Sequence, residues 1–386
     1  MLKIIINSVL VAGGLFMAAS CNDEVVLNPG VPGTGGSGTE KETIRYRALC
    51  IAEKDDVDSY GGETVFRSNL DRMFRNTTRF WNESPNRFEY YFEWVVGDLQ
   101  IYDMQDGETY DDYKHLATGE IDTGKYDFTV FLALRSDRDN ALSCGGGGAS
   151  GQSIVWAYFT ADHNIFTDAE YPDQGTYSNL GHEYGHVRGA QDLYQYMITA
   201  ENNPVNHEAY PYPECNMGTG YMVWSDYCSA LFNFGAHMKQ LPADFARDVF
   251  PDKVSIKVLE DGEPVRATVK LYGTRAGGDH NERDVYAEEG NSPFLEVKTD
   301  RQTGIVEFPQ DDTYSIYDMY NRPDRVTGGR IPSKSPVDYF PFSRWYCFLV
   351  EATAGTRTAY AWLSDLDMVP VHLETGEDTY ELVINL

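Results

Sequence analysis

Basic residues are scarce in this sequence. Its 386 residues include 31 Lys and Arg against 60 Asp and Glu, so the formal net charge is −29 at pH 7. A surface of this charge repels the phosphates of nucleic acids and of anionic membranes, which excludes both as partners. The composition indicates a soluble, well-solvated body, and we expect a monomer.

Cysteine is also scarce, with 6 residues in the chain. None of them has the paired spacing of a zinc finger, so the sequence excludes a cysteine metal site. Cys215 and Cys228 are near enough in sequence to close a short loop. A disulfide between them would stabilise the fold by roughly 3 kcal/mol if it formed without strain.

An apolar run near the start of the chain, residues 4–17, is too short to span a bilayer. It follows Lys3 and precedes three small residues, which together predict a signal peptide over residues 1–21. Cys21 at the junction resembles the lipobox cysteine of bacterial lipoproteins, and this resemblance implies that Cys21 is lipidated. The alternative is an ordinary secretory signal with a chance cysteine.

These features predict a cell-envelope lipoprotein that is anchored in the outer membrane and exposed at the surface. A body that faces the periplasm is the alternative. The N-terminal lipid would be its only contact with the membrane. Residues 22–42 are rich in glycine and proline and cannot form a core, so we interpret them as a flexible tether.

The folded chain divides into two predicted domains, residues 43–250 and 251–386. A run of four glycines at 145–148 in the first domain is typical of a flexible loop, and could also form a lip beside an edge strand. Apolar patterns predict strands and helices in the first domain. The strands are expected at about 44–52, 88–99, 126–134 and 153–160, and the helices at about 65–81 and 177–188.

The second domain has a different pattern. Its apolar residues alternate in short segments separated by turn residues, such as Asp261 and Gly262. We therefore predict an all-β sandwich made of strands alone. Its segments resemble carboxypeptidase-regulatory-like, transthyretin-like modules, which implies a role in support, spacing or substrate contact.

Histidine is rare, with 8 residues in the chain, yet His182 and His186 lie four apart around Glu183. On an α-helix such a pair projects from one face, so both imidazoles can reach one ion. Zinc binds neutral imidazole, and a catalytic zinc keeps three protein ligands and one position for water. Gly189 can end the helix and let the chain turn back, which makes Asp192 the third ligand.

This motif, followed by a methionine turn, is typical of metzincin peptidases. With aspartate as third ligand and the sequence Asp192-Leu193-Tyr194, it resembles the immune-inhibitor-A-like peptidases and snapalysin, or the IgA-peptidase-like secreted lipoproteins. The resemblance implies an α+β zincin catalytic domain with a methionine turn. Met217 is preferred to Met222 for that turn because small residues surround it. Glu208 and Glu214 are alternatives for the third ligand, but neither lies in a convincing helix.

These residues predict a lipid-anchored, zinc-dependent endopeptidase that hydrolyses extracellular or host proteins. Glu183 would take the proton of the attacking water and pass a proton to the leaving amine. Tyr221 and Tyr227 are candidates to donate a hydrogen bond to the oxyanion. The alternative function is a surface binding lipoprotein that keeps the zincin scaffold and has lost peptide cleavage.

Overall fold

The computed structural model describes most of the folded chain. Cys21, Tyr221 and the chain before residue 41, with the predicted signal peptide, lie outside the described residues. Within the described residues, no helix is both long enough and apolar enough to cross a bilayer. The described residues are 41–119, 121–134, 143–147, 154–158, 174–211, 213–218, 222–276, 283–285, 293, 295–321 and 347–386.

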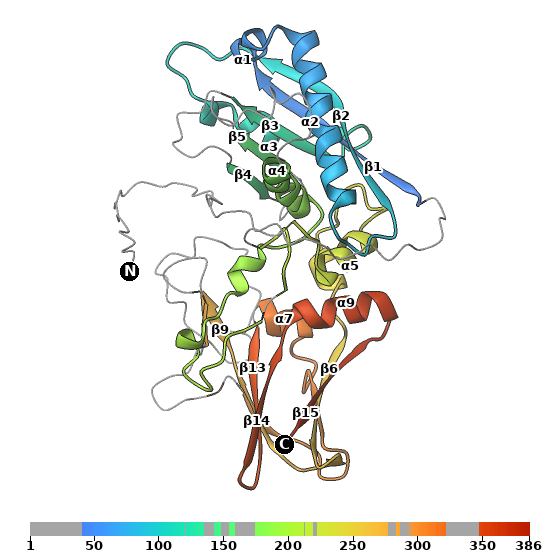
Figure 1. Ribbon diagram of the computed structural model, residues 1–386, viewed down its shortest axis with the longest axis vertical. Helices are drawn as coiled ribbons and strands as arrows, with labels where there is room; N and C mark the ends of the chain where they lie inside the picture. Colours follow the sequence, from blue (N-terminus) through green and yellow to red (C-terminus); the bar gives the residue numbers. More distant parts are fainter. Residues whose placement is uncertain are drawn as a thin grey trace.

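The N-terminal region is built on a five-stranded sheet with the order β2-β1-β3-β5-β4 (Figure 1). Neighbouring strands are parallel from β2 to β5, and β4 is antiparallel to β5. The predicted strands of this region are confirmed within a few residues. The sheet contains β1 (Thr43–Glu53), β2 (Tyr91–Tyr102), β3 (Phe128–Ala133), β4 (Ser143–Gly147) and β5 (Ile154–Tyr158).

Side chains on β1 alternate between the two faces of this sheet, as the period of a strand requires. Ala48 and Cys50 face the main core, whereas Ile51 lies in a smaller cluster with Phe131 on the other face. Both faces are covered, so β3 is buried along its whole length. The short elements of this region include α1 (Lys54–Ser59), η1 (Tyr110–Tyr113), α3 (His115–Thr118), η2 (Leu193–Tyr196), η3 (Ala200–Asn202) and α6 (Phe245–Asp248).

Helix α2 (Glu63–Glu83) forms where the sequence predicts a helix. Its apolar residues recur at helical spacing and are buried against the sheet, which stabilises each by about 1.5–3 kcal/mol. At its end, Trp81 Nε1 donates a hydrogen bond to the carbonyl oxygen of Gly181 over 3.1 Å. This bond fixes α2 to α4 (Gln174–Val187), the second predicted helix, one residue before His182.

The glycine run near residue 145 is a strand. The expectation of a flexible loop is wrong for Ser143–Gly147, which forms the antiparallel edge strand β4. Glycine lowers strand propensity, but the ladder to β5 supplies the backbone pairing that the residues do not supply themselves. Because β4 lies beside α4, a glycine-rich sheet edge runs along the helix that carries the histidines.

The C-terminal region contains two further sheets, with orders β11-β8-β13-β14 and β12-β6-β15. Asp261 and Gly262 both have positive φ and form the predicted hairpin turn. Sheet pairing is antiparallel except between β6 and β15. The strands are β6 (Lys253–Glu260), β7 (Glu263–Pro264), β8 (Thr268–Tyr272), β11 (Leu295–Lys298), β12 (Ile305–Phe308), β13 (Phe348–Ala354), β14 (Arg357–Leu363) and β15 (Thr379–Asn385), with a separate hairpin of β9 (Thr274–Ala276) and β10 (Arg283–Val285).

The prediction that this region contains strands alone is wrong. It also contains α7 (Ile316–Asn321) and α9 (Asp365–Thr375), and α9 lies between the C-terminal sheets and α5 (Asp226–Phe234) (Figure 1). Ser364 caps the start of α9 by accepting a hydrogen bond from the Leu366 backbone, and Gly376 ends it with a φ of 70°. Helix α9 packs on α5, so buried residues of both regions belong to one continuous core.

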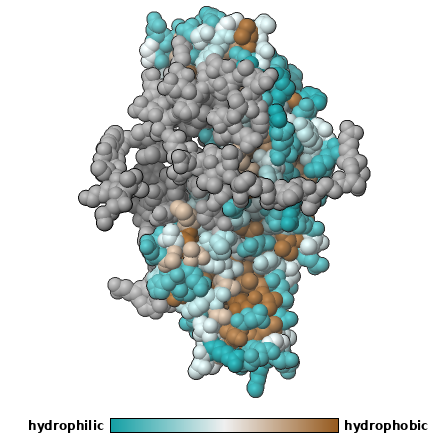
Figure 2. Space-filling view, viewed as in Figure 1, coloured by the Kyte–Doolittle hydropathy of each residue, from teal (hydrophilic) through white to brown (hydrophobic). Residues whose placement is uncertain are grey.

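The two regions differ at their surfaces. On the face seen in Figure 2, an apolar area lies over the C-terminal region, while polar residues dominate the coloured part of the N-terminal region. Val371 of α9 and Val383 of β15 are each 42% exposed. Apart from such residues, the described surface agrees with the acidic, polar composition of the chain.

Candidate metal centre

Helix α4 presents His182 and His186 on one face, as their spacing predicts. The helix also packs closely on the core at Gly185, beside the face that carries the histidines. A Cβ on Gly185 would lie 2.4 Å from Met217 Sδ, so Met217 lies directly against the helix one residue before His186. The helix therefore has little freedom to rotate, which fixes the direction of both imidazoles.

Asp192 reaches the same face because the chain reverses at Gly189. This residue has a φ of +86°, and a Cβ there would lie 2.5 Å from Phe245 Cε1. Both the backbone conformation and the lack of space require glycine. The Leu193 backbone N–H then donates to the Met217 carbonyl over 2.7 Å, which holds the returning segment beside the helix.

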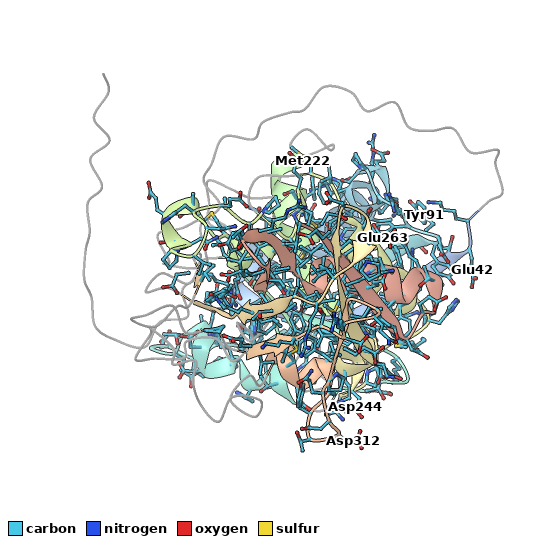
Figure 3. All side chains as sticks on the ribbon, turned by 90° about the horizontal axis from the view of Figure 1, so that it is seen from below. Glu42, Tyr91, Met222, Asp244, Glu263 and Asp312 are labelled. Atoms are coloured by element: carbon cyan, nitrogen blue, oxygen red, sulfur yellow. The ribbon has the colours of Figure 1, made fainter. Side chains whose placement is uncertain are left out.

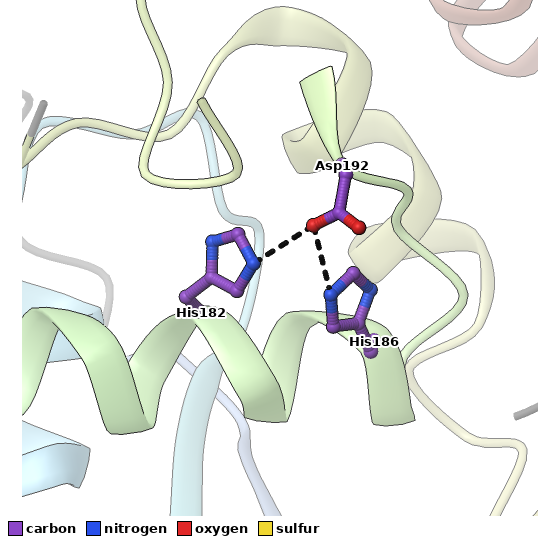
Figure 4. Close-up of side chains that lie close together, drawn as sticks. All are labelled: His182, His186 and Asp192. Carbon is purple, nitrogen blue, oxygen red and sulfur yellow. Dashed lines mark hydrogen bonds and ion pairs between the residues drawn. The ribbon is translucent and has the colours of Figure 1, made fainter. Parts of the chain in front are cut away.

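The three predicted ligand side chains converge (Figure 4). Asp192 Oδ1 lies 2.9 Å from His182 Nε2 and 3.1 Å from His186 Nε2. The side chains of His182, His186 and Asp192 retain 13%, 15% and 17% of their exposure, so the cluster opens to solvent on one side. Among the described residues, this is the group of His, Cys, Asp and Glu side chains with the geometry to hold a metal ion.

The remaining nitrogen of each imidazole defines its tautomer. His182 Nδ1 lies 2.8 Å from the Asn216 carbonyl oxygen, and His186 Nδ1 lies 2.9 Å from that of Ala190. A carbonyl oxygen only accepts, so each Nδ1 carries the hydrogen. In the neutral rings, both Nε2 atoms then direct lone pairs at Asp192 Oδ1. Three acceptors at this distance repel one another unless a cation or extra protons lie between them.

The local electrostatics agree with this arrangement. Burial lowers the pKa of His182, but the hydrogen bond that its ring can donate to Asp192 and the charge of Glu183 outweigh burial and raise this pKa above its usual value. Burial likewise lowers the pKa of His186, but the charge of Asp192 outweighs burial, and the pKa is raised above its usual value. Burial raises the pKa of Asp192, but the two histidines hold it well below the usual range. The site thus favours positive charge at its centre.

The donor set fits zinc. Zinc–nitrogen and zinc–oxygen bonds of about 2.0–2.1 Å place the ligand atoms of a tetrahedral site about 3.3 Å apart. The separations of 2.9 and 3.1 Å between these ligand atoms are within a few tenths of an ångström of that value. Two imidazoles and one carboxylate, each partly exposed, leave room for a further ligand from solvent. Both imidazoles also have the backbone partners that orient metal-binding histidines.

Two residues that support the predicted ligands were not predicted from the sequence. The Gln195 side chain donates to Asp192 Oδ2 over 3.3 Å, and so restrains the oxygen that faces away from the histidines. The Asn216 backbone carbonyl orients His182, and the Asn216 side chain donates to the Ser178 carbonyl over 3.1 Å. The position of Asn216 directly before Met217 was the one available indication of its role.

The two candidate methionines lie in different surroundings. Met217 is fully buried under α4, and its carbonyl holds the segment that carries Asp192. Met222 is half-buried and lies at the margin of the molecule in the view of Figure 3. The assignment of the methionine turn stays a prediction.

Two of the three predicted catalytic residues, Glu183 and Tyr227, lie within the described part of the chain. Glu183 lies beside His182 on α4 and is 8% exposed. Tyr227 is 1% exposed, and its hydroxyl accepts a hydrogen bond from Gln191 over 3.3 Å. Burial raises the pKa of Tyr227 well above its usual range. This location argues against a hydrogen bond from the Tyr227 hydroxyl to a substrate. Tyr221, the other candidate, lies outside the described residues.

Cys215 and Cys228 lie side by side but are not bonded. Their Sγ atoms are 3.4 Å apart, and both are free, buried thiols. A disulfide requires about 2.05 Å, so a small approach would be needed for the bond. The predicted disulfide therefore stays a prediction, which thiol counting with and without a reductant tests. Glu208 and Glu214, the alternative ligands, are both exposed.

Comparison with known proteins gives little. No protein-family profile and no curated protein matches the sequence. One matching solved structure, a chaperone-substrate complex, is 10% identical with a TM-score of 0.33 over 51% of this chain; the match covers 35% of that chain, about a third of its length. Another is a catalytically inactive OgpA from Akkermansia muciniphila in complex with an O-glycopeptide substrate, 8% identical with a TM-score of 0.27, covering 86% of this chain and 96% of that one. Similarity at this level carries no argument about function.

Proposed function

We propose that this protein is a zinc-dependent peptidase with a zincin-like catalytic domain. The observation that carries the proposal is the convergence of three acceptors, His182 Nε2, His186 Nε2 and Asp192 Oδ1, at 2.9 and 3.1 Å. Both Nδ1 atoms already donate to backbone carbonyls, so this arrangement suits a cation better than it suits a neutral protein group. The partial exposure of all three side chains favours a catalytic site over a closed structural one.

The residues of the chain divide the chemistry among them. His182, His186 and Asp192 would hold the metal. Zinc, when bound, lowers the pKa of water toward about 7 and polarises a carbonyl oxygen. Glu183, one residue after His182, receives the proton of the attacking water and delivers a proton to the leaving amine. Its low exposure of 8% shields the carboxylate from bulk water.

An extended peptide is the substrate that suits the surroundings of the site. Strand β4 (Ser143–Gly147) is the edge of the sheet in the described residues, and it runs beside α4. The outer side of this strand can pair with the backbone of a peptide, as many peptide-binding proteins do. The glycines add no side chains there, which allows a close approach of the substrate backbone.

The test is Glu183→Gln, which keeps the size of the side chain and removes the base. We expect the variant to bind zinc like the wild type and to lose hydrolysis of casein and of a peptide library by about 10²–10⁴-fold. Glu89→Gln, an exposed glutamate outside the site, is the matched control. Activity of the wild type should disappear with 1,10-phenanthroline and return with Zn²⁺. Full activity in Glu183→Gln would contradict the mechanism.

The same experiment separates the alternative function. A surface binding lipoprotein without catalysis would hydrolyse nothing in the library even when loaded with zinc. A folded protein that holds no zinc after purification and takes up none would favour that alternative. The intact ligand set and Glu183 support the peptidase.

We further propose that a lipid on Cys21 anchors the protein in the cell envelope. The support is the sequence of residues 1–21 alone. Metabolic labelling with a palmitate analogue should mark the wild type and not Cys21→Ser, and protease added to intact cells should remove the body only if it faces outward.

A further inference from the structure

Buried polar residues join the segment after Asp192 to the C-terminal region. Gln195 and Tyr196 belong to η2, directly after Asp192, whereas Arg283 lies on β10 and Asp365 begins α9. Their exposures are 7%, 1%, 2% and 0% in that order. We call these four residues the junction cluster.

The bonds of the junction cluster connect the two regions at several atoms. The Tyr196 hydroxyl donates to Asp365 Oδ2 over 2.7 Å. Arg283 Nε donates to the Gln195 carbonyl, and the Arg283 backbone N–H donates to the Met197 carbonyl over 2.9 Å. Three consecutive residues, 195–197, are therefore held by side chains or backbone from the C-terminal region.

This segment in turn holds Asp192. Gln195 uses its backbone carbonyl for Arg283 and its side-chain amide for Asp192 Oδ2, so one residue transmits the restraint directly. On the other side of Asp192, Gln191 donates to the Tyr227 hydroxyl. Tyr227 lies on α5, and α5 packs against α9. The third metal ligand is thus flanked by two glutamines, and both lead to the C-terminal region.

The polar groups of the junction cluster cost free energy to bury, and apolar packing would avoid this cost. Burying a guanidinium and a carboxyl is unfavourable compared with apolar residues of the same size. Burial raises the pKa of Asp365 to about 7. Hydrogen bonds fix direction and distance more narrowly than apolar contacts do, and a ligand must be held within about 0.5 Å for its function.

We propose that Asp365 and Arg283 are positioning residues of the metal centre. Through Tyr196 and Gln195 they hold Asp192 within coordinating range of the two histidines. This inference rests on the proposed zinc site, and it gives the C-terminal region a direct part in that site. None of the four residues of the junction cluster is among the three proposed ligands.

The test compares two Tyr→Phe variants. Tyr196→Phe deletes the hydroxyl that bonds Asp365 and keeps the ring. Tyr320→Phe is the matched control, because Tyr320 is also fully buried and its hydroxyl donates over 3.0 Å to the Leu363 carbonyl within the C-terminal region. We expect the Zn²⁺ affinity, measured by competition with a chromophoric chelator, to fall about 10-fold in Tyr196→Phe and less than about 2-fold in Tyr320→Phe.

Two further measurements separate positioning from general stability. The visible absorption band of the Co²⁺-loaded protein should shift in Tyr196→Phe and stay unchanged in Tyr320→Phe. Asp365→Asn should keep the Zn²⁺ affinity within about 2-fold, because the amide oxygen still accepts from Tyr196. If Tyr196→Phe does not fold, Gln195→Met is measured instead, since it removes the amide that bonds Asp192.

The outcomes distinguish the two proposals. Equal losses in both Tyr→Phe variants, or an unchanged Zn²⁺ affinity in Tyr196→Phe, would overturn the positioning role and leave the zinc site intact. A wild-type protein that binds no Zn²⁺ would overturn the zinc site and the positioning role together.

Discussion

The proposed metal centre and the junction cluster are joined by the short segment 192–197, yet their polar groups are paired differently. At the metal centre, three acceptors face one another at 2.9 and 3.1 Å. In the junction cluster, a donor meets an acceptor at each bond described, such as the Tyr196 hydroxyl and Asp365. A buried cluster in which donors meet acceptors builds structure, whereas a cluster of acceptors suits a bound cation. This difference is why we assign a ligand to the first cluster and a supporting role to the second.

Removal of Asp192 is expected to have the largest effect on the proposed metal centre. Structural zinc sites gain about 10–16 kcal/mol from four ligands, so one ligand contributes on the order of 3 kcal/mol. We expect Asp192→Ala to lower the Zn²⁺ affinity at least about 100-fold and to abolish the rise in melting temperature that Zn²⁺ causes. Asp226→Ala, which removes a half-exposed carboxylate that pairs with Arg87, is the control. Calorimetric titration of both variants makes the measurement, and equal affinities would place the metal elsewhere.

The contact between Gly185 and Met217, which fixes the helix of the histidines, is expected to give the next largest effect. Gly185→Ala sets a Cβ against Met217 Sδ, which overlap at 2.4 Å. Overpacking of this kind lowers the free energy of unfolding by about 1–3 kcal/mol, and we expect zinc affinity to fall because Asn216, next to Met217, orients His182. Urea denaturation measures the change.

A double-mutant cycle checks that explanation. Met217→Ala removes the Sδ atom that the new Cβ of Gly185→Ala would overlap. The double variant should therefore lose less stability than the sum of the two single losses. Additive losses would mean that the two residues do not act through this contact.

The junction cluster is expected to make the free energy of unfolding depend on pH. Asp365 is fully buried with a pKa raised to about 7, against about 3.9 in an unfolded chain. Between these values the folded protein binds one proton more than the unfolded one, so the free energy of unfolding falls as pH rises, by up to about 1.4 kcal/mol per pH unit. We expect Asp365→Asn to flatten this slope between pH 4 and 7. Denaturation curves across that range measure it, and a slope equal to that of the wild type would exclude Asp365 as its source.

The sequence predicts what is local and misses what is distant. The spacing of His182, His186 and Asp192 foretells their convergence, because one helix and one glycine reversal bring them together. The partners of the junction cluster are separated by 169 positions for Tyr196 and Asp365, and by 88 for Gln195 and Arg283. No short-range pattern records such contacts.

The errors in the fold have similar causes. Strand β4 was missed because its glycines favour a loop until the neighbouring strand supplies the pairing. Helix α9 was missed because Pro370 lies inside it and its apolar residues have weak helical periodicity. Its capping residues, Ser364 and Gly376, were visible in the sequence and would have indicated a helix between them.

The short span of the three donors has a consequence for assembly. His182 and Asp192 are only ten positions apart, so an unfolded chain keeps them at a high effective concentration. We therefore expect the proposed site to capture zinc before the chain folds. Because the denatured chain would also bind the ion, saturation with zinc should raise the free energy of unfolding by less than the affinity of the native site implies.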